Sequence, residues 1–266
     1  MARDGTKLVR ITNTPGAEVF PTWSPDRTRI AFTRNFQLFT IHADGTDEQL
    51  VAPMAGRERS PGFDYLGPAA WSPDGLRIAY MYPRQPVFDG SDLTDESYGT
   101  ALHIIDSDGT NDGELPNPPT RTVNSIGWSS TNLLSFTVDD DCADCAGGRF
   151  YAFESPDGSD NSAVDQNGTT PNAALDWSPD SSTWVYVGGR DAGNEVDANL
   201  IYTSRSDGAD ISELGASRGT SPRWSPDASA VAFIGDDGNL HVMAGSSDSV
   251  IVVGIAQGGT SNGLDW

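Results

Sequence analysis

Lysine is almost missing from this chain of 266 residues, and positive charge as a whole is scarce. Lys7 is the one lysine beside fifteen arginines, whereas aspartate and glutamate together number 38, so the formal net charge is −22. A surface with that balance repels phosphate backbones and anionic lipid headgroups. We therefore expect no nucleic-acid partner and no binding to a membrane surface.

Long apolar runs are missing as well. No stretch of about 18 apolar residues occurs, and residues 1–4 are not followed by the apolar core of a signal peptide. No segment repeats its apolar residues with the period of an amphipathic helix. The sequence therefore predicts no membrane insertion and an all-β domain.

What the chain has in quantity is a repeat that begins with tryptophan. The stretch from Trp71 to Tyr80 reads WSPDGLRIAY, and related copies occur along the whole chain. The copies start at Trp23, Trp71, Trp128, Trp177 and Trp224, and the chain ends on a further tryptophan, Trp266. The intervals lie between 42 and 57 residues, and periods in that range are typical of propellers and solenoids.

Each copy predicts four strands. The Trp closes the first strand, Ser-Pro-Asp-Gly forms a turn, and an alternating run such as residues 29–33 forms the second strand. A third strand ends in an Asp-Gly hairpin turn, as in residues 38–46 and 102–110. A short fourth strand, such as residues 48–51 or 211–214, leads to the next Trp. Four antiparallel strands per repeat make one propeller blade.

These residues resemble the repeat of TolB-type β-propellers, which are related to the WD-repeat class. The resemblance rests on Trp-Ser-Pro-Asp-Gly-x-x-Ile-Ala-Phe followed by Leu-Tyr-x-x-x-x-Asp-Gly-Thr, and it covers nearly the whole chain. The third copy departs at Ser130, Thr131 and Asn132, which weakens that turn but leaves the strand pattern intact. We expect one propeller domain over residues 1–266. The resemblance implies a periplasmic or extracellular protein that associates with other proteins.

Five complete sets of four strands are present, and two single strands remain. Residues 7–12 have the character of an outer strand with no blade before them, and residues 261–266 read as an innermost strand. An inner and an outer strand are not neighbours within a blade, so these two cannot pair directly. We predict five complete blades and a partial sixth, with a closed five-bladed ring as the alternative. Because unpaired strand edges recruit other chains, a partial blade predicts self-association.

The long connections should all lie on one face of the propeller, which we call the loop face. They are residues 53–67, 83–100, 139–148 and 188–199. Each joins the second strand of a blade to the third, or the fourth strand to the next blade. In an up-and-down blade these connections leave from the same face, opposite the Ser-Pro-Asp and Asp-Gly turns. Loops longer than the connection requires are usually functional.

Arginine and aromatic side chains, which dominate interface hot spots, are concentrated in or beside these connections. We predict that the loop face binds a protein or a small polar ligand. The predicted partner-binding residues are Arg57, Arg59, Phe63, Tyr65, Tyr82, Arg84, Phe88, Tyr98 and Arg121. The alternative is that these arginines only offset nearby aspartates in an acidic protein.

The residue before each repeat Trp should lie at one level of the central channel. At the last three repeats these residues are Asp176, Arg223 and Asp265, which places a guanidinium between two carboxylates. One interpretation is an ion pair between neighbouring blades. The other is a small polar ligand or ion held at the channel mouth.

Motifs for catalysis and for metal binding lack the context they need. Residues 215–219 match Gly-x-Ser-x-Gly, but a nucleophile elbow requires a strand before it and a helix after it. His103 and His241 occupy the column that Phe39 holds in the first repeat, which indicates packing residues. Acidic stretches such as residues 139–141 do not match a calcium-binding loop. We predict no catalytic residue, no metal ligand and no cofactor.

Cys142 and Cys145 are the only thiols. A zinc site would need a second pair of ligands, and a thioredoxin-type motif needs a helix in a βαβ context. We predict a disulfide within this loop, which indicates an extracytoplasmic location.

Together these observations favour a noncatalytic TolB-like propeller that binds a partner or ligand through its loop face. Two alternatives from another class stay open. One is an accessory propeller that gates a prolyl-oligopeptidase-type hydrolase, and the other is a propeller enzyme that acts on peptide or glycan. The acidity also has two interpretations, which are adaptation to salt and a coding bias combined with acidic turns.

Overall fold

The computed structural model describes residues 9–35, 37–53, 68–83, 100–115, 123–138, 150–157, 161–164, 169–191, 196–245 and 247–252. Within these ranges every regular element is a β-strand, as the sequence predicts. The same ranges contain no helix that could cross a membrane.

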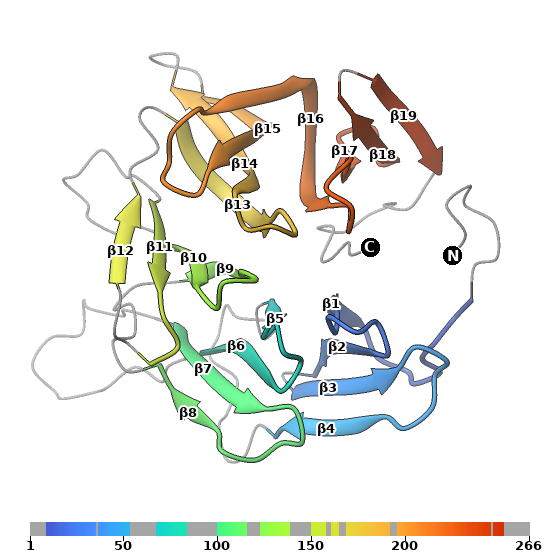
Figure 1. Cartoon of the computed structure of the whole chain (residues 1–266). Coiled ribbons are helices and arrows are strands. Elements are labelled where there is room, and N and C mark those ends of the chain that lie inside the picture. The colour runs from blue at the N-terminus through green and yellow to red at the C-terminus, as the bar shows by residue number, and fades with distance from the viewer. Residues whose placement is uncertain are drawn as a thin grey trace, which may run out of the picture.

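The strands follow one another as antiparallel neighbours (Figure 1). The first sheet holds β1 (Glu18–Trp23), β2 (Arg29–Arg34), β3 (Gln37–His42) and β4 (Gln49–Ala52). The second holds β5 (Ala69–Trp71), β6 (Arg77–Pro83), β7 (Thr100–Asp106) and β8 (Gly113–Glu114). The third holds β9 (Val123–Trp128), β10 (Leu134–Val138), β11 (Phe150–Glu154) and β12 (Asn161–Val164). The last holds β13 (Thr169–Trp177), β14 (Thr183–Asp191), β15 (Val196–Arg205), β16 (Ser212–Trp224), β17 (Val231–Gly235), β18 (Leu240–Ala244) and β19 (Ser247–Val252).

The last sheet contains two blades because they share the strand β16. The first part of β16 pairs with β15, and its last part, from Gly219 to Trp224, pairs with β17. We number the blades one to five as β1–β4, β5–β8, β9–β12, β13–β16 and β16–β19. Figure 1 shows them arranged around a common centre, with the first strand of each blade innermost. This is the arrangement of propeller blades.

Hydrogen bonding in the first turn of each blade explains why the repeat keeps serine and aspartate. In blade two the buried Ser72 hydroxyl donates to Asp74 Oδ1 at 2.6 Å and accepts from the Arg77 backbone N at 2.9 Å. Asp74 Oδ1 also accepts from the Leu76 backbone N at 3.0 Å. The same three bonds form around Ser24, Ser178 and Ser225.

The third copy keeps its turn although it lacks Pro-Asp-Gly. The Ser129 and Thr131 hydroxyls lie 3.0 Å apart, and the Leu133 backbone N donates to Ser129 Oγ at 2.9 Å. Thr131 thus takes the place of the aspartate, and β10 follows as in the other blades. The prediction that this departure leaves the strand pattern intact is confirmed.

Apolar clusters between consecutive blades form the core. Leu38 of blade one packs with Trp71 and Ile78 of blade two, and Leu102 of blade two packs with Phe136 of blade three. Two of the repeat tryptophans also donate hydrogen bonds across these interfaces. Trp71 Nε1 donates to the Thr22 carbonyl at 3.2 Å, and Trp177 Nε1 donates to Ser135 Oγ at 2.8 Å. Trp71 and Trp177 therefore help to attach blades two and four to the blades that precede them.

At the N-terminal end the structure differs from the sequence-based prediction. Residues 9–12, the described part of the predicted outer strand, do not lie in a strand. Ile11 packs against Ile30 and Phe32 on the side of blade one that faces away from blade two. The apolar residue that suggested a strand therefore serves as a cover for this sheet face. Residues 253–266 lie outside the described residues, so the partial sixth blade and the five-bladed alternative both stay predictions.

Candidate functional site

The ends of the described strands define the loop face. β4 ends at Ala52 and β5 begins at Ala69, whereas β6 ends at Pro83 and β7 begins at Thr100. Because neighbouring strands alternate in direction, these ends lie on the same face, opposite the Ser-Pro-Asp and Asp-Gly turns. The connections predicted at 53–67, 83–100 and 139–148 thus start and finish close to where the sequence predicts. The connection predicted at 188–199 is wrong in its bounds, because β14 continues to Asp191 and β15 (Val196–Arg205) already begins at Val196.

Most side chains predicted to bind a partner on the loop face lie outside the described residues. These are Arg57, Arg59, Phe63, Tyr65, Arg84, Phe88, Tyr98 and Arg121. Tyr82 belongs to β6, one residue before the end of that strand. Asp265 of the channel level and the predicted disulfide between Cys142 and Cys145 also fall outside the described ranges.

Two of the three residues predicted at the channel level are described. Asp176 lies on β13 and Arg223 on β16, and both are half-buried. Asp176 Oδ2 accepts a hydrogen bond from the Trp224 backbone N at 2.7 Å, and Arg223 Nη1 donates to the Pro222 carbonyl at 3.0 Å. Asp176 therefore joins the inner strands of blades four and five. This contact favours a role between blades, while a ligand at the channel mouth stays a prediction.

The histidines of the third strands pack against aromatic residues of the second strands. His103 lies opposite Tyr80 with ring centroids 5.5 Å apart, and His241 lies opposite Phe233 at 5.1 Å. In blade one the same cross-strand position holds Phe32 and Phe39. The interpretation of these histidines as packing residues is confirmed. Among the described residues, no three His, Cys, Asp or Glu side chains are grouped so that they could hold a metal ion.

The Gly-x-Ser-x-Gly match lies inside β16. Gly215 has a positive φ of 65°, which suits glycine. A Cβ on Gly219 would lie 2.3 Å from the Ile234 carbonyl oxygen, so glycine is required there by the close approach of β17. Both glycines have backbone roles in a continuous strand, which agrees with the conclusion that this motif is not a nucleophile elbow.

A buried arginine lies on the side of blade one that faces away from blade two. The Arg34 guanidinium stacks over Phe39 at 4.3 Å from the ring centroid and forms ion pairs with Glu18 and Glu48. Burial opposes ionisation of Glu18, but hydrogen bonds with Thr14, Thr12 and Arg34 hold its pKa below the ordinary value. Arg34 is thus engaged in internal contacts on several sides.

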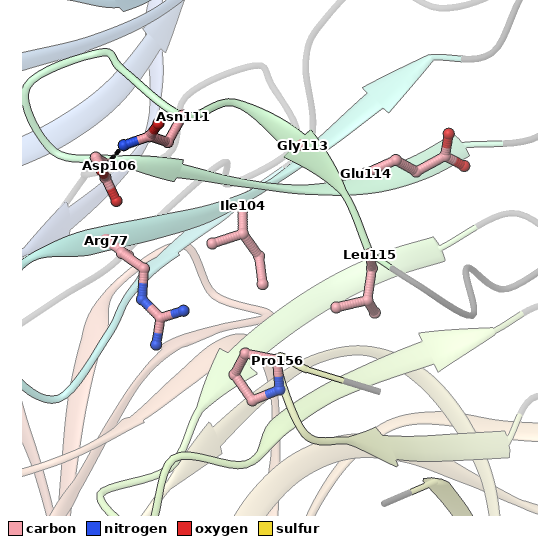
Figure 2. A pocket seen from close by; sticks show the side chains of 8 residues that line it. All are labelled: Arg77, Ile104, Asp106, Asn111, Gly113, Glu114, Leu115 and Pro156. Atoms are coloured by element: carbon pink, nitrogen blue, oxygen red, sulfur yellow. Dashed lines mark hydrogen bonds between the residues drawn. The ribbon is translucent and has the colours of Figure 1, made fainter. Parts of the chain in front are cut away.

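A hollow of about 320 Å³ lies at the opposite end of blade two from the loop face, and we call it the blade-two pocket (Figure 2). Its walls come from β6, β7, the Asp-Gly turn and β8, together with one residue after β11 of blade three. The lining residues are Arg77, Ile104, Asp106, Asn111, Gly113, Glu114, Leu115 and Pro156. Ile104, Leu115 and Pro156 supply apolar surface, and Arg77 supplies a positive charge.

Arg77 is held in the blade-two pocket by an aromatic ring of the next blade. Its guanidinium carbon lies 5.4 Å from the centroid of the Trp128 ring. Figure 2 shows the guanidinium on the side of Pro156, away from the hydrogen-bonded pair formed by Asp106 and Asn111. The sequence analysis did not predict this pocket, because its lining residues lie on strands and short turns and not in the long connections. A comparison of Arg29 with Arg77 and of their neighbours across the repeats could have found it.

The comparisons with known proteins address the fold. No protein-family model matches the chain, and no curated protein matches it. Solved structures do match. A protein of Agrobacterium tumefaciens assigned as TolB is 16% identical with a TM-score of 0.66, and the match covers 91% of this chain and 83% of that chain. An oligogalacturonate lyase from Vibrio parahaemolyticus is 15% identical with a TM-score of 0.62, covering 91% and 67%. A chain of a nidogen–laminin complex is 12% identical with a TM-score of 0.62, covering 88% and 78%.

At these identities the matches establish the fold and nothing finer. They agree with the four-stranded antiparallel blades of this chain. The chain therefore has the fold of a TolB-type β-propeller.

Proposed function

We propose that this chain is a noncatalytic TolB-like propeller that binds a protein partner or ligand through its loop face. One observation carries the proposal. The described strands bring the ends of the connections 53–68, 84–99 and 139–149 to a single face. Function in a repeat fold is concentrated where loops are longer than the architecture requires.

Two further points support binding. The predicted partner-binding residues of the loop face are four arginines and five aromatic residues, with Tyr82 at the end of β6 counted among the aromatic ones. These residue types dominate interface hot spots. In addition, a propeller of the same fold has been solved within a nidogen–laminin complex, which is an assembly of two proteins. We place the chain in the periplasm or outside the cell, in line with the TolB resemblance and with the proposed disulfide between Cys142 and Cys145.

An enzymatic role is the alternative, because a solved oligogalacturonate lyase shares the fold. The two proposals are separated by incubating the chain with oligogalacturonate and with a panel of peptides. Turnover that is abolished by substitutions on the loop face would replace the binding proposal with a catalytic one.

The binding proposal is tested by truncating two side chains of the loop face. We expect Arg84→Ala and Tyr98→Ala to weaken capture of a partner from the extracytoplasmic fraction of the source organism. The melting temperature should change little, because exposed truncations rarely alter stability. Arg205→Ala is the matched control, since Arg205 is an exposed arginine on the face with the short turns. Capture that both loop-face variants leave unchanged would refute the proposed site.

A further inference from the structure

We propose that the blade-two pocket binds a carboxylate that is joined to an apolar group. The free C-terminus of a peptide with an apolar last residue has this chemistry, and so does a small apolar carboxylic acid. The pocket lies at the end of blade two that carries the short turns. The inference therefore does not rest on the function proposed for the loop face.

Blade one contains an arginine, Arg29, at the position that Arg77 has in blade two, and all the side-chain partners described for Arg29 belong to blade one. Arg29 opens β2 as Arg77 opens β6. The Arg29 guanidinium donates to Thr40 Oγ1 and to Asp47 Oδ2, both at 3.1 Å, and lies 3.1 Å from His42 Nε2. Its donors are thus used within blade one.

Blade two has replaced these acceptors. By strand register Ile104 stands where blade one has Thr40, and Asp106 stands where it has His42. Asn111 replaces Asp47, with the same φ of 53° after the Asp-Gly-Thr turn. The Asp106 carboxylate accepts from Asn111 Nδ2 at 2.6 Å. Within the described part of the chain, Arg77 forms no ion pair and donates no side-chain hydrogen bond.

The contact with Trp128 fixes the guanidinium and leaves its donors accessible. A cation–π contact uses the face of the guanidinium or its charge, whereas the N–H groups lie in the guanidinium plane. Those N–H groups form a fork that matches a planar carboxylate with two parallel hydrogen bonds. The Trp128 ring is itself fixed, because its Nε1 donates to Asn132 Oδ1 at 3.1 Å. The geometry is that of a preorganised site for a carboxylate.

The other walls indicate what the carboxylate should be attached to. Ile104, Leu115 and Pro156 offer apolar surface beside the guanidinium (Figure 2). A volume of about 320 Å³ is at the small end of ligand pockets, which span roughly 300 to 1,000 Å³. It suits one terminal residue or one small acid.

The negative side chains of the pocket restrict the charge of the ligand. Asp106 and Glu114 line the same hollow, and the whole chain carries −22. Each additional negative charge on a ligand would be repelled by these carboxylates. We therefore expect one carboxylate to bind, and inorganic phosphate, with its higher charge at neutral pH, to bind poorly.

The experiment follows the indole N–H resonance of Trp128 in the ¹⁵N-labelled full chain, assigned with Trp128→Phe. The probes are N-acetyl-leucine, the peptide Gly-Gly-Leu, its C-terminal amide and inorganic phosphate. We expect the two carboxylates to shift the resonance in a saturable way, and the amide and phosphate to leave it in place. Response to the peptide alone identifies a peptide terminus as the ligand, whereas response to both admits small acids. An amide that binds as well as the acid would overturn the proposal, and so would a resonance that no probe shifts.

Three variants separate the pocket from general effects on the fold. Arg77→Gln should weaken binding about ten- to a hundredfold, which corresponds to a lost charged hydrogen bond. Ile104→Thr combined with Asn111→Asp keeps Arg77 but restores the acceptors found in blade one, so binding should fall although the charge remains. Arg29→Gln is the matched control, which should keep normal affinity even if it lowers the melting temperature. Unchanged affinity in either blade-two variant, with a folded spectrum, would contradict the proposed role of Arg77.

Discussion

The residue after the aspartate, or after Thr131 in blade three, has a left-handed backbone in every Ser-Pro-Asp-type turn. These residues are Arg27, Gly75, Asn132, Ser181 and Ala228, with φ between 56° and 71°. Only blade two has glycine there. For a residue with a Cβ this conformation costs roughly 1 to 2 kcal/mol, whereas glycine adopts it without a steric penalty.

We therefore predict that Ala228→Gly stabilises the chain by about 0.5 to 1 kcal/mol, once the greater freedom of glycine in the unfolded state is subtracted. Gly75→Ala should have the opposite effect. Its new Cβ would have only Pro25 Cδ nearby, at 3.8 Å, so backbone conformation alone would be tested. Denaturant unfolding measures both changes. Ala209→Gly, at an exposed position without positive φ, is the control and should be destabilising.

The turn aspartates also determine how the chain responds to acid. Hydrogen bonds from Asn239 lower the pKa of Asp237 to about 2, and the Ser72 hydroxyl together with the Leu76 amide lowers the pKa of Asp74. A carboxyl whose pKa is lower in the folded state stabilises the fold above its unfolded pKa. That contribution is lost as the pH falls through the folded pKa.

We predict that the melting temperature falls steeply as the pH is lowered from about 4 to about 2, the interval between the unfolded pKa and that of Asp237. Asp237→Asn should be less stable than the parent chain at neutral pH and should lose less stability over this interval. Melting curves at several pH values provide the measurement. Parallel curves for parent and variant would show that Asp237 does not contribute in this way.

Arg29 and Arg77 show where sequence reasoning stops at the residue scale. Both belong to an Arg-Ile-Ala segment after a Ser-Pro-Asp turn. Their surroundings are decided by Thr40 and Asp47 in one blade and by Ile104 and Asn111 in the other. Those partners come from the third strand and the following turn, so no local pattern around the arginine reveals them. The packing role of His103 and His241 could be predicted, because both occupy the position in the repeat that Phe39 holds in blade one.

At the scale of the blade, close approach to the neighbouring blade is as important as apolar burial. Gly127 lies on the inner strand of blade three, where a Cβ would be 2.8 Å from Ser135 Oγ and 2.9 Å from Leu175 Cδ2 of blade four. Trp177 Cδ1 would be 3.2 Å away. The absence of a side chain at Gly127 thus permits the tryptophan of blade four to reach Ser135.

We predict that Gly127→Ala destabilises the chain by about 1 to 3 kcal/mol, as expected for overpacking in a core. Gly113→Ala is the matched control, because a Cβ there meets nothing within 4 Å. Thermal unfolding of both variants tests the interface. If Gly127→Ala is as stable as Gly113→Ala, the blades can separate more easily than this packing implies.

The strands and turns of the blades were the most predictable part of the fold. The alternating runs and the Asp-Gly turns predicted the second and third strands closely, as with β3 at Gln37–His42. Two boundaries were not predictable. Residues 9–12 alternate like a strand but serve to cover blade one, and residues 215–219 resemble a connection but continue β16. In both cases tertiary contacts, which the local sequence does not record, decide the outcome.

For the whole molecule, the sequence predicted the TolB-type fold, and the solved structures confirm it. It could not provide the candidate site to the same degree. The loop-face prediction depends on side chains outside the described residues, whereas the blade-two pocket arises from residues on four segments of the chain. The fold can be predicted because every blade repeats the same sequence pattern. The blade-two pocket cannot be predicted in this way, because it depends on residues that differ from one blade to the next.

The net charge of −22 leads to a prediction for the molecule as a whole. Raising sodium chloride from about 10 mM to about 1 M shortens the screening length from roughly 30 Å to 3 Å. We expect the melting temperature at pH 7 to rise, because repulsion among surface carboxylates is screened. Near the isoelectric point of about 4.1 the same salt series should have a smaller effect. Equal salt responses at the two pH values would show that self-repulsion is not the cause.

The shared strand β16 has a consequence for how the propeller opens. Elsewhere a connecting segment separates the outer strand of one blade from the inner strand of the next, but β16 runs from the edge of blade four, where it pairs with β15, into blade five, where it pairs with β17. Because the two halves of β16 belong to one continuous strand, we expect displacement of that strand to disturb the edge of blade four and the inner strand of blade five together, which amide hydrogen exchange would detect. We therefore expect blades four and five to open together, whereas the other blades are joined only by connecting segments and by contacts with their neighbours.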